Sequence, residues 1–317
     1  MKEAVVYVYL QHDLPTCFWP SLKKTREMWD GDIYLVAPRR EESHGDIEKY
    51  GVKFVACDSP QSENVGGFMT TAPDGSATKD PLISKYEEVS FFGTLYPAWD
   101  GFWDNACKRF FFLYLLQKKY GINRVIHLET DVVAYIPIRE MFDKFSELYS
   151  GKLVFSPHAQ EQLSCCFMYC DSVTVLKTFC DETLKYFELG REHFSTLYPT
   201  QSILNETNFA YTFMMENPDL VGLFPTLPDE PLAAELGFLI DSTSWGMWVN
   251  GLQRHNFPRY AANTHNIGKR LLAGEFGIHF EFNGETLVRP WVHNKLTNQT
   301  TPLATLHFNS KRLDKWL

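Results

Sequence analysis

Two acids follow directly on a short apolar run in this chain, and they are the residues with the clearest capacity for chemistry. The run is Val125 to Leu128, and Glu129 and Asp131 come after it, one residue apart. Burying a carboxylate is costly unless a cation or hydrogen-bond donors compensate for the lost water. If the strand continues through both acids, residues two apart point to the same face, so the carboxylates lie side by side and repel.

A divalent cation would relieve that repulsion, and carboxylate oxygens suit Mg²⁺ or Mn²⁺. The alternative is that the strand ends at Leu128 and that the two acids are solvated loop residues. This stretch by itself leaves both interpretations open.

The composition is that of an ordinary globular protein. Its 317 residues are 44% apolar and 22% charged, which allows one large α/β domain or two modest ones. The net charge of −9, without a Lys/Arg run longer than two, predicts no nucleic-acid partner. The N-terminus lacks a signal-peptide pattern, and no apolar run approaches the roughly 20 residues that span a bilayer. We therefore expect a cytoplasmic protein with no integral membrane segment.

The seven cysteines do not form a metal-binding pattern. Their number is odd and no C-x-x-C pair occurs, so a zinc site is poorly supported. Cys165, Cys166 and Cys170 lie in an apolar run, which predicts buried free thiols.

The first 60 residues alternate between strand and helix patterns. Residues 4–10, 32–37 and 53–57 predict strands, and residues 15–29 and 41–50 predict helices. This order predicts a parallel sheet covered by helices. Ligands of such sheets bind beyond the carboxyl ends of the strands, which places Gln11, His12 and Asp58 at the mouth of a pocket. For His12, an exposed loop position is the simpler interpretation.

A long connection and a buried helix come next. Residues 59–96 are rich in Gly, Pro, Ser and Thr, which predicts either a lid or an insertion without function. Residues 102–119 are apolar nearly all round, which predicts a buried helix. Arg109 lies inside this helix, and a buried guanidinium needs an anion. It either faces the same cleft as the two acids or pairs with a structural carboxylate.

The second half is less regular. It predicts helices at 137–145, 173–189 and 203–215, and strands at 153–155, 163–170, 220–224 and 286–291, with a last segment at 303–311. Residues 237–251 and 254–277 predict loops. Since no repeat or linker interrupts the chain, we expect one domain, with a first half at 1–135 and a variable half at 136–317.

Several well-known motifs are missing. The first strand is not followed by G-x-G-x-x-G, and neither a P-loop nor a G-x-S-x-G elbow occurs. Dinucleotide oxidoreduction, P-loop phosphoryl transfer and α/β-hydrolase chemistry therefore lose most of their support. The acidic pair and a histidine close to the C-terminus, His307, are left as the chemical features.

On these residues the chain resembles the GT-A glycosyltransferases. Glu129-Thr130-Asp131, preceded by the helix with Arg109, is similar to their D-x-D region, and His307 is similar to the late histidine of their metal site. The resemblance implies a GT-A (Rossmann-like) fold with a mostly parallel central sheet, and a glycosyltransferase that moves sugar from a UDP- or GDP-sugar donor to a glycan or other hydroxyl acceptor. It also implies Mn²⁺ or Mg²⁺ held by Glu129, Asp131 and His307. Because Glu is longer than Asp, Glu129 binds either the metal or the ribose.

The resemblance implies further donor contacts. The nucleotide base is expected over the first strands, near Tyr9, Gln11 and Asp58, with Arg109 facing the same cleft. Lys311 either reaches a phosphate oxygen or lies exposed in the tail. Residues 1–135 would then bind the nucleotide, and residues 136–317 would bind the acceptor and supply the C-terminal metal ligand.

An inverting enzyme also needs a general base on the acceptor side, whereas a retaining one does not. The candidates are Asp241, Glu206 and Asp171. We favour Asp241, because residues 237–251 combine small residues with Trp245 and Trp248, which would let a sugar approach and stack. Buried tryptophans in a turn are the alternative interpretation.

Two other functions are compatible with parts of this pattern. A nucleotidyltransferase that makes sugar nucleotides would need a Gly-rich, basic loop after the first strand, and residues 11–16 are neither. A non-catalytic glycan-binding protein on a GT-A scaffold would not need Glu129, Asp131 and His307, all of which are present.

Overall fold

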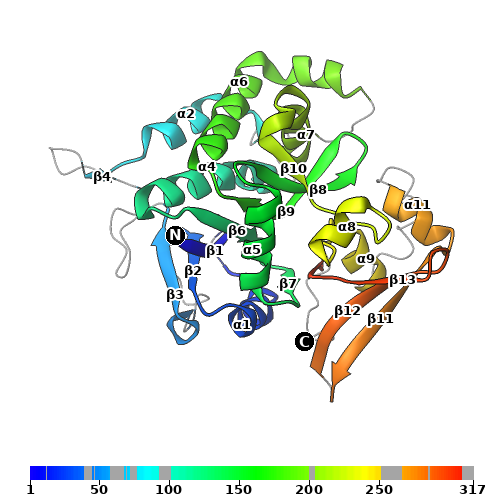
Figure 1. The fold of residues 1–317 in the computed structure, drawn as a ribbon. Helices are drawn as coiled ribbons and strands as arrows, with labels where there is room; N and C mark the ends of the chain where they lie inside the picture. The colour runs from blue at the N-terminus through cyan, green and yellow to red at the C-terminus, as the bar shows by residue number, and fades with distance from the viewer. Residues whose placement is uncertain are drawn as a thin grey trace.

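A central seven-stranded sheet organises the part of the chain that the computed structural model describes (Figure 1). The described residues are 1–11, 13–38, 45, 47–57, 68, 70–71, 77–92, 101–199, 204–250, 266–284 and 286–308. In the order in which they lie in the sheet, the strands are β10 (Val221–Leu223), β8 (Leu153–Ala159), β9 (Gln162–Cys170), β6 (Arg124–Leu128), β1 (Glu3–Val8), β2 (Asp32–Ala37) and β3 (Val52–Ala56).

Neighbouring strands run parallel except around β9, which is antiparallel to both β6 and β8. The fold class expected from the sequence, α/β with a mostly parallel sheet, is confirmed. The antiparallel strand follows from a short connection, because residues 160–161 between β8 and β9 leave room only for a hairpin.

Helices cover both faces of this sheet, which explains why its strands are mostly apolar. Along β1, Val6 faces one apolar core, while Val5 and Tyr7 face another. The first core contains side chains of α2 (Pro81–Val89), α4 (Phe102–Tyr120), α6 (Val173–Leu197) and α7 (Glu206–Glu216). The second core contains side chains of α1 (Phe18–Met28) and α5 (Ile138–Leu148). Figure 1 shows these two groups on opposite sides of the sheet.

The C-terminal region builds a third apolar core beside the sheet. Val133 and Tyr135, which follow β6, share this core with Leu303 and Leu306. The two halves of the chain are therefore joined by common packing as well as by the backbone. The elements of this region are β7 (Val132–Ala134), α8 (Pro231–Leu236), α9 (Ser244–Asn250), α11 (Asn266–Leu272), β11 (Phe276–Asn283), β12 (Thr286–Asn294), β13 (Gln299–Pro302) and β14 (Thr305–His307).

Four short elements complete the description: η2 (Ile47–Tyr50), β4 (Thr70–Thr71), β5 (Ala77–Thr78) and η4 (Pro218–Leu220). Cys165, Cys166 and Cys170 are buried and free, as the sequence predicts. No helix in these ranges has both the length and the apolar character needed to cross a bilayer.

Some predictions for the second half are wrong. Residues 237–251 are not a loop throughout, since α9 occupies Ser244–Asn250, and the predicted loop at 254–277 contains α11 and the start of β11. The sequence hides α9 because the helix contains Gly246 and other weak helix formers. Its first amides are capped by Asp241, which lies three residues before the helix. The predicted end of the helix at residue 189 is confirmed, because the backbone of Gly190 is not helical (φ 82°). A second helical segment continues α6 to Leu197 beyond this kink.

Candidate metal site

The two acids lie on a tight turn rather than on a strand. Strand β6 ends at Leu128, and the amide of Val132 donates to the carbonyl of Glu129 over 3.1 Å. The expectation of continued strand geometry is therefore wrong. The alternative of solvated loop acids is also wrong for Asp131, which is 5% exposed. The Glu129 side chain is 29% exposed.

Pairing between two short strands brings the distant histidine to this turn. Strand β14 runs antiparallel to β7, with His307 opposite Val132. The amide of Phe308 also donates to the carbonyl of Asp131 over 3.0 Å. The backbone thus fixes His307 beside the acidic turn before any side-chain contact is considered.

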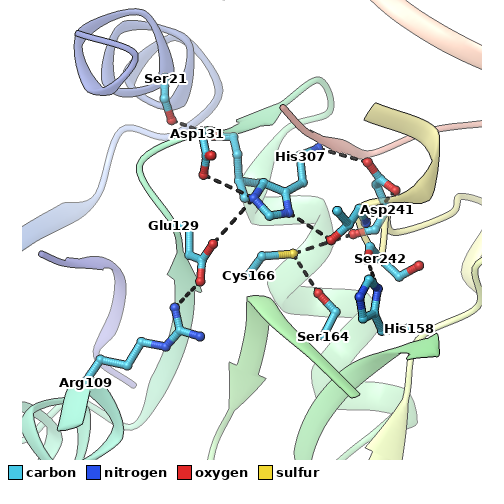
Figure 2. A network of polar contacts seen from close by, with 12 residues as sticks. Ser21, Arg109, Glu129, Asp131, His158, Ser164, Cys166, Asp241, Ser242 and His307 are labelled. Carbon is cyan, nitrogen blue, oxygen red and sulfur yellow. Dashed lines mark hydrogen bonds and ion pairs between the residues drawn. The ribbon is translucent and has the colours of Figure 1, made fainter. Parts of the chain in front are cut away.

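The three predicted metal ligands converge. His307 Nε2 lies 3.2 Å from Asp131 Oδ1 and 3.4 Å from Glu129 Oε2. Figure 2 marks both contacts with dashed lines. One ligand atom from each residue lies within 4.8 Å of the others. Octahedral coordination at the Mg²⁺–oxygen distance places adjacent ligands about 3 Å apart, so the trio has the spacing of such a site. Two carboxylates and one imidazole suit Mn²⁺ or Mg²⁺.

The imidazole of His307 is held on both sides. Its Nδ1 lies 2.9 Å from the hydroxyl of Thr243, which leaves Nε2 facing the carboxylates. Burial by itself lowers the pKa of His307, but the nearby Cys166 thiol and the Asp131 carboxylate outweigh burial and raise the pKa well above its usual value. Without a cation, therefore, the histidine acts as the positive partner of the acids.

Arg109 extends from α4 to the opposite side of the acidic turn. Its Nη1 pairs with Glu129 Oε1, and its Nη2 lies 3.2 Å from Glu206 Oε1. Burial raises the pKa of Glu129, but Arg109 and His307 overcome this and lower it to about 2. The sequence left open whether Arg109 faces the cleft or pairs with a carboxylate, and in the structure it does both.

Glu206 is the first residue of α7 and is buried beside Arg109. The preceding Asn205 caps the helix, with Asn208 completing a capping box. Burial raises the pKa of Glu206 to about 7 against the opposing attraction of Arg109. Its Oε2 is buried and has no hydrogen-bond partner in the described part of the chain.

These side chains line one cavity of about 340 Å³, within the usual range for small-molecule sites. Tyr9 and Gln11 enter it just beyond the carboxyl end of β1, and the Tyr9 hydroxyl donates to Gln11 Oε1 over 2.9 Å. The cavity thus brings together seven predicted site residues: Tyr9, Gln11, Arg109, Glu129, Asp131, Glu206 and His307.

Other predicted residues are placed differently. Asp241 does not line this cavity; it is 1% exposed, and its carboxylate accepts backbone N–H groups. Asp171 follows β9 at the end of the sheet away from the acidic turn, where it accepts from the amide of Gly151. Asp58, Lys311 and His12 lie outside the described residues.

Several lining residues were not anticipated from the sequence. Thr243, Ser164 and His158 all reach the cavity, and His158 Nδ1 lies 2.9 Å from the carbonyl of Ser242. None of them belongs to a motif or a periodic pattern. Their role depends on which distant segments the fold places together.

Neither a protein-family model nor a curated protein sequence matches this chain. Among solved structures, apo mouse xyloside xylosyltransferase 1 aligns at 11% identity with a TM-score of 0.42, over 71% of this chain and 84% of that chain. The galactosyltransferase LgtC, solved with donor and acceptor sugar analogues, aligns at 9% identity with a TM-score of 0.44, over 96% of this chain and 87% of that chain.

Proposed function

We propose that this protein is a metal-dependent glycosyltransferase that moves a sugar from a UDP- or GDP-sugar to a hydroxyl group of a glycan or other acceptor. The observation that carries the proposal is the convergence of Glu129, Asp131 and His307 in a cavity beyond the carboxyl end of the sheet. A nucleoside diphosphate leaves with several negative charges, which must be stabilised as they develop.

The acidic turn and His307 would hold the cation. Asp131 and His307 are the more buried ligands, and Glu129 completes the trio from a partly exposed position. A bound Mn²⁺ or Mg²⁺ supplies Lewis-acid stabilisation of the diphosphate charge.

Residues at the ends of the strands would orient the donor. Tyr9 and Gln11 line the cavity beyond β1, where mononucleotides bind in parallel α/β sheets. The guanidinium of Arg109 is held in place by Glu129 and Glu206. Its N–H groups can therefore donate to sugar hydroxyls without a loss of side-chain entropy on binding.

Of the three general-base candidates, Glu206 has the most suitable surroundings. It lines the cavity, its pKa of about 7 suits proton transfer near neutral pH, and one oxygen has no hydrogen-bond partner in the described structure. If transfer is inverting, Glu206 would accept the acceptor's hydroxyl proton. If transfer is retaining, the same oxygen would bind a sugar hydroxyl.

Thermal melts with UDP or GDP, each with and without Mn²⁺, test the proposal. A nucleotide present at 100 times its dissociation constant should stabilise the protein by about 2.7 kcal/mol, and only when Mn²⁺ is present. A panel of UDP- and GDP-sugars then identifies the donor by Mn²⁺-dependent hydrolysis. The matched variants are Asp131→Asn in the site and Asp32→Asn at the other end of the sheet, where Asp32 pairs with Lys53 over 2.6 Å.

We expect Asp131→Asn to lose the Mn²⁺-dependent stabilisation and Asp32→Asn to keep it. Stabilisation by nucleotides that is independent of Mn²⁺ would contradict the metal role. Mn²⁺-dependent binding without hydrolysis or transfer of any sugar in the panel would instead favour a non-catalytic glycan-binding protein.

A further inference from the structure

We propose that Asp241 and Thr243 are positioning residues that fix the imidazole of His307 for metal binding. This inference rests on the metal site of the proposed function, and it replaces the role of general base that the sequence suggested for Asp241. It concerns a layer of side chains behind the ligands, shown at the right of Figure 2.

The carboxylate of Asp241 is the centre of this layer. Oδ1 accepts from the amides of Thr243 and Trp245, over 2.8 and 3.0 Å, and these contacts cap the first turn of α9. Oδ2 accepts from the amides of Gly246 and His307, over 2.8 and 2.9 Å. One buried carboxylate therefore joins the start of α9 to the backbone of a metal ligand 66 residues away.

Thr243 carries this connection to the imidazole. Its hydroxyl lies 2.9 Å from His307 Nδ1, and both residues line the cavity. A histidine that binds a cation through Nε2 must carry its proton on Nδ1, so Nδ1–H donates to the Thr243 hydroxyl. The contact thereby selects the tautomer and the ring orientation in which the Nε2 lone pair faces Asp131 and Glu129.

The backbone of Thr243 is strained in the position that brings its hydroxyl to His307. Its φ is 104°, a region that is strongly unfavourable for a β-branched residue. Glycine would adopt this conformation without strain, so local stability does not account for a threonine at this position. Such strain persists where surrounding contacts impose it, and it is concentrated at functional sites.

Gly246 lets α9 approach close enough for this arrangement. A Cβ at this position would lie 2.0 Å from the carbonyl oxygen of His307 and 3.0 Å from Asp241 Oδ2. The backbone of β14 thus packs directly against the first turn of α9. The helix that was not predicted from the sequence is therefore part of the support for the ligand.

Mn²⁺ titration followed by electron paramagnetic resonance tests the inference without an activity assay. Loss of a contact behind a metal ligand typically costs 10–100-fold in metal affinity, and we expect Thr243→Val to weaken Mn²⁺ binding by that factor. Thr243→Ser keeps the hydroxyl and should bind within threefold of wild type. Thr243→Gly removes both the hydroxyl and the strain, so it should melt no lower than wild type yet bind as weakly as Thr243→Val.

Thr300→Val is the matched control, because the Thr300 hydroxyl lies 3.1 Å from Nδ1 of His293 on the exposed sheet. Long-range ¹H–¹⁵N spectra of metal-free, histidine-labelled protein should show a changed His307 Nδ1 signal only in Thr243→Val, and a changed His293 signal only in Thr300→Val.

Wild-type affinity in both Thr243→Val and Thr243→Gly would overturn the inference and leave the metal site standing. A wild-type protein that does not bind Mn²⁺ would overturn the metal site and the inference together.

Discussion

Glu206→Gln is expected to stabilise the protein above neutral pH and to have little effect in acid. In the folded state burial raises the pKa of Glu206 from 4.5 to about 7. The charged and titratable groups around it are Arg109, which lowers this pKa, Glu129, which raises it, and the buried thiols of Cys107 and Cys165. The loss of water outweighs the attraction of Arg109.

The sign and the size follow from proton linkage. Between pH 4.5 and about 7 the folded state holds the Glu206 proton while the unfolded state has released it, so wild-type stability falls as pH rises through this window. The difference between the folded and unfolded pKa values lowers the free energy of unfolding of wild type by about 3 kcal/mol once the pH exceeds 7. Gln cannot ionise, so the variant does not lose this stability. For a chain of this length, the variant should therefore melt about 5 °C higher than wild type above pH 7.

Paired thermal melts of wild type and Glu206→Gln from pH 4 to pH 9 measure the difference curve. It should be near zero at pH 4, rise between pH 5 and pH 7, and then level off. Glu188→Gln is the control, because the Glu188 side chain is 51% exposed and its pairing with Lys85 is worth less than about 1 kcal/mol. A variant that is less stable than wild type at pH 8 would refute the reasoning, since the ion pair with Arg109 would then outweigh burial.

Three further predictions concern the site and the core. Asp131→Ala should weaken Mn²⁺ binding in a direct titration by at least 100-fold, because it removes a ligand and not only a residue behind one. Its melting temperature without metal should stay within a few degrees of wild type. Undiminished affinity would exclude Asp131 as a ligand. Arg109→Lys should raise the KM for the donor sugar by about tenfold, since one ammonium cannot reach both Glu129 and Glu206. An unchanged KM would show that Arg109 does not contribute to donor binding. Phe145→Ala should cost about 3–5 kcal/mol in urea unfolding, because Phe145 is fully buried among aromatic rings; a cost below about 1 kcal/mol would contradict this packing.

Much of the first half could be predicted because its signals are local. Strands buried on both faces need apolar residues at every position, and such runs can be recognised without knowing their neighbours. The same applies to α4, where an apolar surface around Arg109 predicts both burial and an ionic partner. The partners themselves, Glu129 and Glu206, lie on other elements and could not be chosen from spacing alone.

The second half was harder to predict because its elements depend on distant contacts. Helix α9 begins where Asp241 accepts backbone amides, and the same carboxylate also holds the amide of His307. The small residues of this segment are weak helix formers, so the sequence predicts a loop there. The bond from Asp241 to the His307 amide joins positions 66 residues apart and follows from no local pattern. Asp241, the favoured general-base candidate, is 1% exposed among these amides, and no local pattern predicts that burial.

By itself the sequence determined the residue types: an acidic pair after an apolar run, an arginine in a buried helix and a late histidine. Such residues can be recognised from sequence because a charged side chain beside an apolar run is costly to bury without a partner. Only the tertiary structure decided that the acids lie on a turn, that β14 pairs with β7, and that a strained threonine lies against the imidazole. Those features depend on pairing between segments far apart in the chain, and such pairing is determined by packing and backbone hydrogen bonds rather than by local pattern.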